Sequence, residues 1–382
     1  SSLAGTAGAP APKVWVLVGR RAGDRAQLLG LAEALGWPFE VKELAYNRLH
    51  NLPNLLLGAS TATLDRNHSS PLAQPWPDLV LDCGKRSVPI ARWIRDQSGG
   101  RMRWVHLGRS WAPIELFDLV ITTPQYRLLP RPNVLLNAAP LHRVTPERLA
   151  ESAAAFERPW TDLPRPWFAL LVGGDSPPYV LDPATAQRLG TVASAIAKAA
   201  GGSLLVTTSG RTRPAAVDAL HGAISCPTFF HRWQPDAKDN PYLAYLALAD
   251  SLIVTGDSAS MLAEACAAGK PVALFDLPER PGLTGRSLAA IERLFGSHGS
   301  RTNYRGMPKQ QDLLARTFDR LIERGLFMAP RDLAAYHQAL IDRGLVHRVG
   351  ERAPAAPRRP LDDLQEAVNR VRKLMAAERR VD

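Results

Sequence analysis

The stretch Ser251–Phe275 (SLIVTGDSASMLAEACAAGKPVALF) constrains the fold most, because its pattern changes from strand to helix and back. The short apolar run Ser251–Thr255 predicts a buried strand. Apolar residues then recur at helical spacing up to Gly269, which predicts the end of a helix. Val272–Phe275 predicts the next strand. Strand, helix and strand in this order indicate one βαβ unit of a parallel sheet.

The loop Gly256–Ser260 begins this predicted helix with hydroxyl groups and free backbone N–H groups. A helix N-terminus carries partial positive charge and suits an anion such as phosphate. Ser260 and Glu264 are four residues apart, so they share one helix face. They offer a hydrogen-bond donor to phosphate and a carboxylate to ribose hydroxyl groups. A well-capped helix with a surface glutamate explains the same residues, so both interpretations are open.

Strand, glycine-containing loop and helix recur along the rest of the chain. Lys13–Gly19 predicts a strand buried on both faces, and Gln27–Leu35 predicts the helix that follows. The pattern restarts at Trp167–Val172, after a proline-rich connection. We therefore expect an α/β protein with two Rossmann-like, doubly wound parallel-sheet domains that face a central cleft. The predicted parts are a flexible tail at 1–12, domains at 13–160 and 161–345, and a linker with a basic C-terminal helix at 346–382, which could pack back on the first domain.

The charge balance indicates an anionic partner. The formal net charge is +11 and the pI is near 9.9, which suits a phosphorylated ligand or an anionic membrane surface, although a solvated basic surface explains it equally. Nucleic acid is not expected, because the arginines are dispersed and no nucleic-acid-binding motif is present. Cys83, Cys226 and Cys266 have no metal-ligand spacing, and a reduced cytoplasmic compartment is the default. No run of about 18 apolar residues predicts a transmembrane helix, and residues 1–12 do not resemble a signal peptide.

Two segments indicate contact with a membrane. Leucines crowd the segment Arg48–Ser60 (RLHNLPNLLLGAS), which either packs in the core or forms a hydrophobic docking patch for a membrane or lipid acceptor. Leu361–Arg380 predicts a basic amphipathic helix. Together with the positive charge, they suggest peripheral attachment to the inner face of an anionic membrane.

Three loops of the second half share a preference for anions. Gly173 and Gly174 follow a strand and allow close approach of the backbone to a ligand. Arg211 and Thr212 follow the next strand and offer a guanidinium and a hydroxyl to phosphate. With the loop at Asp257–Ser260, they favour a phosphate or nucleotide ligand more than any one loop does.

Several segments resemble the plant mitochondrial-fission (elongated-mitochondria) family and its bacterial relatives. They cover Val14 to Phe275 in the expected order and include GRRAGDRAQ, LVLDCGKRSVPIARWIR, FDLVITTPQY, NVLLNAAPLHRVTPERL, LLVGGD, LLVTTSGRTRP, NPYLAYLALADSLIVTGDSASMLAEACAAGKPV and LFDLP. This family is similar to glycosyltransferases with two Rossmann domains (the GT-B type), in which the second domain binds a nucleotide sugar. The resemblance implies the following donor site: Ser258 and Ser260, with Asp257, on phosphate; Glu264 on ribose; Gly173, Gly174, Arg211 and Thr212 beside the diphosphate; and Phe230, His231 and Trp233 at the nucleobase.

The chain departs from the family pattern after FDLVI, where Thr123-Pro124-Gln125-Tyr126 replaces the usual His-Asp pair. The role of this segment in binding the acceptor is therefore in doubt. A second departure is Ser209-Gly210-Arg211-Thr212, where the more usual sequence is RRT and one phosphate donor is lost.

An inverting, metal-independent glycosyltransferase of this type needs a general base near the acceptor and positive groups at the departing diphosphate. Asp24 is our candidate base, although it also suits an N-cap of the following helix, and His106 and His142 are weaker candidates. Arg20, Lys85 and Arg86 are the candidate acceptor-binding residues, with a solvated loop as the alternative. No DxD pair is present, and we expect neither a metal nor a cofactor.

Two further functions are open. The plant relatives are associated with recruiting a fission dynamin at the mitochondrial surface, so the resemblance also implies a non-catalytic, membrane-associated scaffold. A nucleotide-sugar epimerase uses two such domains as well. It would need a second acid or base across the cleft, which the sequence does not single out.

Overall fold

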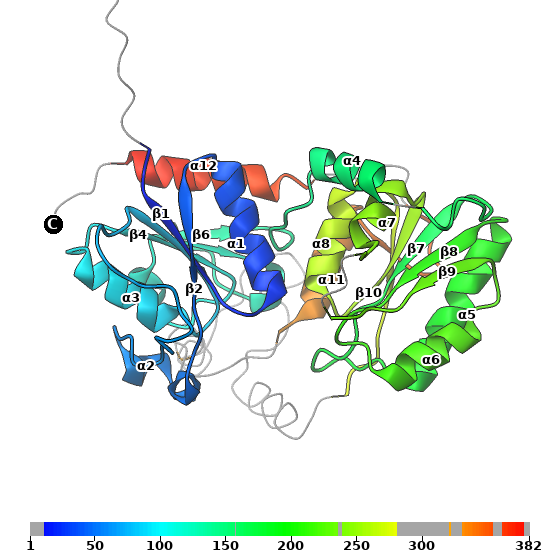
Figure 1. Ribbon diagram of the computed structural model, residues 1–382, viewed down its shortest axis with the longest axis horizontal. Coiled ribbons are helices and arrows are strands. Elements are labelled where there is room, and N and C mark those ends of the chain that lie inside the picture. The colour runs from blue at the N-terminus through cyan, green and yellow to red at the C-terminus, as the bar shows by residue number, and fades with distance from the viewer. Residues whose placement is uncertain are drawn as a thin grey trace, which may run out of the picture.

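The computed structural model describes residues 11–156, 158–235, 239–280, 321, 331–353 and 361–377. Residues 1–10 of the expected tail lie outside this part. The sequence also predicts a loop and helix at 282–295 and a helix at 310–324, and apart from Leu321 these lie outside it as well. In the described part the chain forms two α/β lobes side by side, each built on one sheet (Figure 1).

The N-terminal lobe holds a six-stranded parallel sheet in the order β2-β1-β3-β4-β5-β6. Its strands are β1 (Val14–Val18), β2 (Phe39–Glu43), β3 (Leu79–Cys83), β4 (Arg103–Leu107), β5 (Leu119–Thr122) and β6 (Val134–Leu136). The helical segments between them are α1 (Ala22–Leu35), η1 (Arg48–Asn51), α2 (Asn54–Leu57), α3 (Val88–Gln97), η2 (Ile114–Leu116) and η3 (Pro124–Tyr126). Apolar side chains cover both faces of the sheet, which explains the continuous apolar runs of the central strands.

The C-terminal lobe repeats this plan with the strand order β12-β11-β10-β7-β8-β9, again parallel. Its strands are β7 (Trp167–Leu171), β8 (Ser203–Thr207), β9 (Thr228–His231), β10 (Ser251–Thr255), β11 (Val272–Phe275) and β12 (His347–Arg348). Its helices are α5 (Pro183–Ala199), α6 (Pro214–Ala223), α7 (Tyr242–Leu248), α8 (Ala259–Ala267) and α11 (Leu333–Asp342), with α4 (Pro146–Ala155) on the connection between the lobes. The fold is the expected pair of Rossmann-like, parallel-sheet domains.

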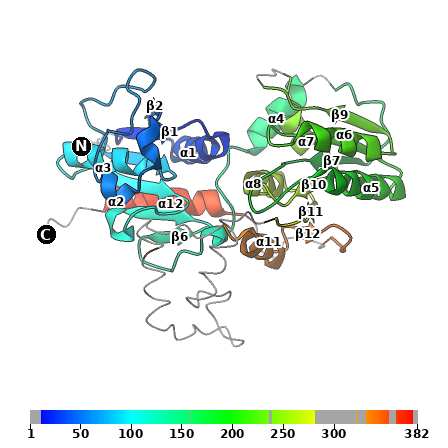
Figure 2. The same ribbon diagram turned by 90° about the horizontal axis from the view of Figure 1, so that it is seen from below.

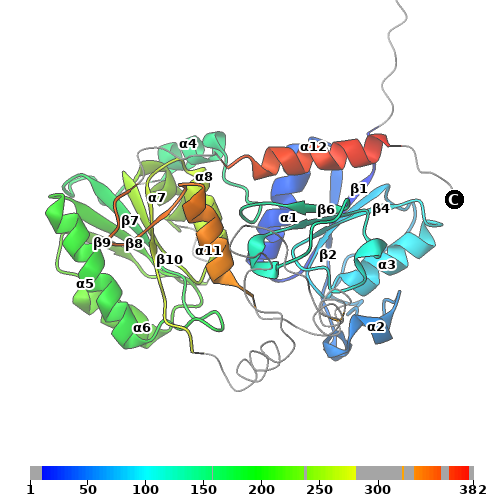
Figure 3. The ribbon, with the colours of Figure 1, turned by 180° about the vertical axis from the view of Figure 1, so that it is seen from behind.

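The last helix, α12 (Asp363–Ala376), crosses back to the N-terminal lobe and lies beside α1 (Figure 3). It buries Ala367, Val368 and Val371 in that lobe's core. Its apolar stripe is therefore buried within the protein. The prediction of peripheral attachment assumed that this stripe faces a membrane, and the structure does not leave it exposed for that contact.

The two lobes meet through the carboxyl-terminal ends of their sheets, where α1 and α8 lie on facing sides and α11 lies between the lobes (Figure 2). Arg127 Nε of the N-terminal lobe donates to Asp332 Oδ2 at 2.8 Å, and the Asp332 backbone N–H donates to the Gln125 carbonyl at 2.9 Å. Ligands of open α/β sheets bind at these ends, so the boundary between the lobes is where a site is expected.

Candidate functional site

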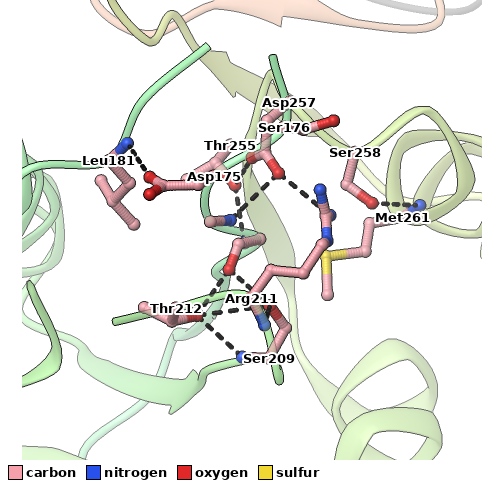
Figure 4. Close-up of polar contacts among 12 residues, drawn as sticks. Asp175, Ser176, Leu181, Ser209, Arg211, Thr212, Thr255, Asp257, Ser258 and Met261 are labelled. Carbon is pink, nitrogen blue, oxygen red and sulfur yellow. Dashed lines mark hydrogen bonds and ion pairs between the residues drawn. The ribbon is translucent and has the colours of Figure 1, made fainter. Parts of the chain in front are cut away.

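Three loops of the C-terminal lobe meet at Gly173 and Gly174, after β7 (Figure 4). The Gly173 N–H donates to Thr255 Oγ1 at 2.8 Å, and the Gly174 N–H donates to Asp257 Oδ2 at 3.0 Å. Gly174 has φ +156°, and a Cβ there would lie 2.2 Å from the Arg211 carbonyl oxygen. Glycine is therefore required here because the chain approaches itself closely, a reason that the sequence did not reveal.

Asp257 is the buried centre of this junction, with 2% of its surface exposed. Besides the Gly174 N–H, its carboxylate accepts from the Thr255 hydroxyl at 2.7 Å and pairs with Arg211 Nη2 at 3.0 Å. Burial raises the pKa of Asp257, and the nearby Arg211 is the main opposing influence. Both carboxylate oxygens are engaged within the protein, so Asp257 positions the loops and Arg211.

The hydroxyl groups of Ser209 and Thr212 both donate to the Gly173 carbonyl, which fixes the loop after β8. Thr212 thus faces the junction. Arg211 keeps 41% of its side chain exposed and points toward Ser258 at the start of α8 (Figure 4). Of these side chains, the Arg211 guanidinium is the one with exposed surface to offer a ligand.

The N-terminus of α8 faces the other lobe. Ser258 is its N-cap, is buried, and accepts from the Met261 N–H at 3.4 Å. Ser260 lies in the first turn, and a Cβ added to Gly23 of α1 would lie 3.2 Å from Ser260 Oγ. The structure therefore brings the predicted phosphate-binding helix start against the loop that carries Asp24.

Glu264, one turn along α8, accepts a hydrogen bond from the Tyr242 hydroxyl of α7. Burial raises the pKa of Glu264, and the Tyr242 hydroxyl lowers it in part. Tyr242 was not predicted, because no spacing within the sequence links it to Glu264. Its hydroxyl holds the carboxylate in place and leaves the second oxygen without a hydrogen-bond partner among the described residues.

The three residues expected at a nucleobase do not share one surface. Phe230 packs against the His221 ring of α6 at 4.6 Å, while the neighbouring Phe229 and His231 border a pocket of about 380 Å³ beside Pro159 and Pro241. Side chains alternate along a strand, which explains the separation of Phe230 from His231. Trp233, 40% exposed, covers Gly210 instead.

Asp24 lies in the first turn of α1, three residues after the N-cap Arg21, so it is not the N-cap that the alternative interpretation required. Its carboxylate accepts a hydrogen bond from the Cys83 thiol. Burial raises the pKa of Asp24, against the lowering influence of Arg21, Cys83, His106 and Arg331. A partly buried carboxylate with a raised pKa is a better base than an exposed one.

The two histidines considered as alternative bases have other surroundings. His106 is fully buried, with Nδ1 bonded to Asp82 Oδ1 at 2.7 Å and Nε2 to the Arg109 carbonyl at 2.7 Å. Both ring nitrogens are thus occupied, and His106 is structural rather than a base. The backbone carbonyl of His142 lies close to Gly30 of α1, and burial lowers the pKa of the His142 ring.

The candidate acceptor residues lie at the same edge of the N-terminal sheet. Arg20 is exposed after β1. Lys85 Nζ donates to the Asn51 carbonyl at 3.2 Å, and burial with the neighbouring Arg86 lowers its pKa. The Arg86 guanidinium lies 5.9 Å from the centre of the Tyr46 ring. Lys85 and Arg86 thus connect the edge of the cleft to the leucine-rich segment.

The sequence analysis missed two arginines at the boundary. Arg109 follows β4 and is buried, and Arg331 precedes α11 in the other lobe. The electrostatic influence of Arg331 reaches Asp24, Arg109 and Tyr126. Neither arginine belongs to a motif, and Arg331 is more than 200 residues from its neighbours in the N-terminal lobe.

Within the described ranges, no group of three or more His, Cys, Asp or Glu side chains is placed to hold a metal ion. In the same part of the chain, no helix is both long enough and apolar enough to cross a membrane.

Comparison with known proteins identifies relatives of this chain. Residues 22–302 match the family model described as mitochondrial fission ELM1. The chain is 26% identical over 218 residues to the mitochondrial fission protein ELM1 of Arabidopsis thaliana, covering 51% of each protein, so it spans about half the length of that relative. It is 20% identical over 298 residues to the uncharacterized protein RP120 of Rickettsia prowazekii, covering 69% of this chain and 83% of that protein.

Among solved structures, the UDP-GlcNAc 2-epimerase of Methanocaldococcus jannaschii is similar at a TM-score of 0.43 and 10% identity, over 96% of this chain and 100% of that chain. The ADP-heptose LPS heptosyltransferase II of E. coli is similar at a TM-score of 0.38 and 12% identity, over 69% and 84%. The family-model match covers well over half of the sequence, and the chain therefore belongs to the mitochondrial fission ELM1 family.

Proposed function

We propose that this protein transfers a sugar from a nucleotide-sugar donor to an acceptor, as a metal-independent inverting glycosyltransferase of the GT-B type. The observation that carries the proposal is the close approach of Gly23 to Ser260, because it sets a partly buried carboxylate, Asp24, opposite the N-terminus of α8. One lobe supplies a base and the other supplies an anion-binding helix start, as such a reaction requires.

The donor belongs on the C-terminal lobe. The helix start at Ser260 and the Arg211 guanidinium would bind the diphosphate and stabilise the charge it gains on leaving. Glu264, held by Tyr242, would accept from ribose hydroxyl groups. His231 and the pocket beside it would take the nucleobase, because aromatic and proline side chains line that pocket together with Arg158 and Asp239, and His231 Nε2 has no hydrogen-bond partner among the described residues.

The acceptor belongs on the N-terminal lobe. Asp24 would remove the proton from the acceptor hydroxyl as its oxygen attacks the anomeric carbon from the face opposite the diphosphate. The bond from that carbon to the diphosphate oxygen breaks, and its electron pair leaves with the diphosphate. The acceptor gains the sugar with inverted configuration, and the proton stays on Asp24.

Isothermal titration calorimetry with a panel of nucleoside diphosphates tests the donor site. We expect one of them to bind, and Glu264→Ala to weaken that binding by about tenfold or more, since hydrogen bonds to a charged group contribute about 1.5–3 kcal/mol. Glu147→Ala, on the exposed first turn of α4, is the matched control and should leave the affinity unchanged. If no nucleoside diphosphate binds, or if both variants bind like the wild type, the donor assignment is wrong.

The proposal includes peripheral attachment to an anionic membrane through the leucine patch, defined here as Leu49, Leu52, Leu55 and Leu56. These side chains are 46%, 42%, 64% and 73% exposed. No acidic residue occurs from Leu44 to Leu64, and Asn54 Nδ2 anchors the segment to the Lys85 carbonyl at 3.0 Å. Leucines that insert into a bilayer beside Lys85 and Arg86 would bind best to an anionic lipid surface. Such binding would bring the loop that carries these two acceptor residues to the membrane.

The same patch favours a second candidate function, a scaffold that binds a partner and performs no transfer. Exposed apolar patches rimmed by polar residues also mark protein interfaces. A folded protein that binds no nucleoside diphosphate, yet depends on the leucine patch for its interactions, would support the scaffold instead.

A further inference from the structure

Arg109 is a buried cation that lacks a counter-ion in the described part of the chain. It is 7% exposed, and no carboxylate among the described residues pairs with its guanidinium. Instead the guanidinium lies 5.1 Å from the centre of the Trp111 ring and 5.7 Å from that of Tyr126. Stacking on aromatic rings leaves the in-plane N–H groups free to donate. A buried charge without a partner costs several kcal/mol, so this residue needs an explanation.

Three other arginines that are buried in part or stacked on a ring have carboxylate partners. Arg95 and Arg103 both pair with Asp118. The exposed Arg165 stacks on Trp167 with 3.8 Å between guanidinium and ring centre, and it also pairs with Asp250 at 2.9 Å. Arg109 differs from these three arginines in this respect.

A second cation, Arg331, comes to the same place from the other lobe, because the N–H of the next residue, Asp332, donates to the Gln125 carbonyl at 2.9 Å, directly before Tyr126. Arg331 Nη2 donates to the hydroxyl of Ser176, a neutral partner, at 2.8 Å. Burial lowers the pKa of Arg109, and Arg331 lowers it further because like charges repel. Asp24 lies within the electrostatic reach of Arg331, and Asp332, the residue after Arg331, already pairs with Arg127. In the described part of the chain, one partly buried carboxylate is thus left for two cations.

We propose that Arg109 and Arg331 bind an oxyanion, a phosphate or carboxylate group, at the boundary between the lobes. An oxyanion there would accept from both guanidinium groups, remove their repulsion and join the two lobes. Resting on the proposed function, we assign this anion to the acceptor rather than the donor, since Arg109 belongs to the lobe of Asp24 and follows β4, the strand next to β3. The acceptor of the reaction would then be an anionic molecule whose charged group sits near its attacking hydroxyl.

Calorimetric titration with inorganic phosphate at constant ionic strength tests the site. The wild type should bind phosphate, and Arg109→Gln should bind it about tenfold more weakly or worse. Arg165→Gln is the matched control, because it removes a stacked arginine at the opposite edge of a sheet and should not change phosphate affinity. Arg331→Gln changes an exposed residue, so it gives a second test that does not depend on core packing.

Three results would overturn the inference: a wild type that does not bind phosphate, an Arg331→Gln variant that binds it normally, or a folded Arg109→Gln variant that does so. Titration of the same proteins with nucleoside diphosphate separates donor from acceptor. The acceptor assignment predicts that Arg109→Gln keeps its nucleoside diphosphate affinity, and an equal loss would overturn it. Phosphate binding at Arg109 without any nucleoside diphosphate binding would support the oxyanion site while contradicting the proposed function.

Discussion

Three carboxylates at the boundary between the lobes have raised pKa values, and burial is the main cause at each. Their partners differ. Asp257 has Arg211 and two further donors, and Glu264 has a neutral phenol. Asp24 has a thiol, a weak donor, and no cation within ion-pair distance in the described residues. The fold therefore stabilises the charged form of Asp24 least among the three carboxylates, as expected for a residue whose role is catalytic rather than structural.

This difference predicts that Asp24→Asn stabilises the protein. The folded pKa of Asp24 is raised, so its favourable contribution is present below the unfolded value of about 3.9 and is lost as pH rises through the folded pKa. Removing the charge should raise the melting temperature at pH 7, and the gain should shrink toward pH 4. Thermal unfolding at several pH values measures it.

Asp65→Asn is the control for this experiment, because Asp65 is exposed and its pKa is lowered by hydrogen bonding from His68. It should not raise the melting temperature at pH 7. If Asp24→Asn lowers the melting temperature at pH 7, the carboxylate serves stability and is a poor candidate for the base.

At the scale of elements, strands were predictable from the sequence because parallel strands covered on both faces are continuous apolar runs. The first residues of the helices were less predictable. The loop predicted at Gly19–Asp24 is in fact helical from Ala22, so Gly23 and Asp24 belong to α1. The contacts of the site came from different elements, as with Tyr242 and Glu264, and no local pattern encodes such pairs.

The leucine patch also shows where sequence reasoning stopped. Core packing and surface docking were both open for the segment Arg48–Ser60, and the structure leaves four of its leucines exposed. The reason is geometric: Asn54 is the buried residue of α2, so this short helix turns its polar anchor inward and its leucines outward.

Vesicle flotation tests the role of the patch. We expect the wild type to float with vesicles of phosphatidylcholine and phosphatidylserine, and to float less when phosphatidylserine is omitted or salt is raised. The Leu55→Glu, Leu56→Glu double variant should lose this binding by a factor on the order of 100, since each inserted leucine contributes about 1.5–3 kcal/mol. Leu136→Glu, at a leucine 56% exposed on β6, is the control and should still float. Flotation that ignores lipid charge, or that survives the double variant, would contradict membrane docking.

At the scale of the molecule, α4 lies on the connection from the first lobe to the second, and α12 lies back on the first lobe. The sequence indicated two domains and an amphipathic last helix. It left two positions open for that helix, against the first domain or at a membrane, because an apolar stripe does not specify the surface that covers it. The structure buries the stripe on the N-terminal lobe, and Arg372 donates to the Leu35 carbonyl at the end of α1. The last segment of the chain is thus part of the first lobe's core.

This arrangement predicts that a change in α12 destabilises the lobe that is farther away in the sequence. Val371 is fully buried against the N-terminal lobe, so Val371→Asp places an unpaired charge in that core at a cost of about 3 kcal/mol or more. Differential scanning calorimetry should resolve two transitions in the variant, with that of the N-terminal lobe lowered by roughly 10 °C. Asn369→Asp adds the same charge on the exposed side of α12 and should change the melting temperature little.

A bound nucleoside diphosphate should raise the C-terminal transition alone, because a ligand stabilises the part that binds it. A single transition at a lower temperature would mean that the lobes unfold as one unit. A lower melting temperature of the C-terminal transition would contradict the packing of α12 on the N-terminal lobe.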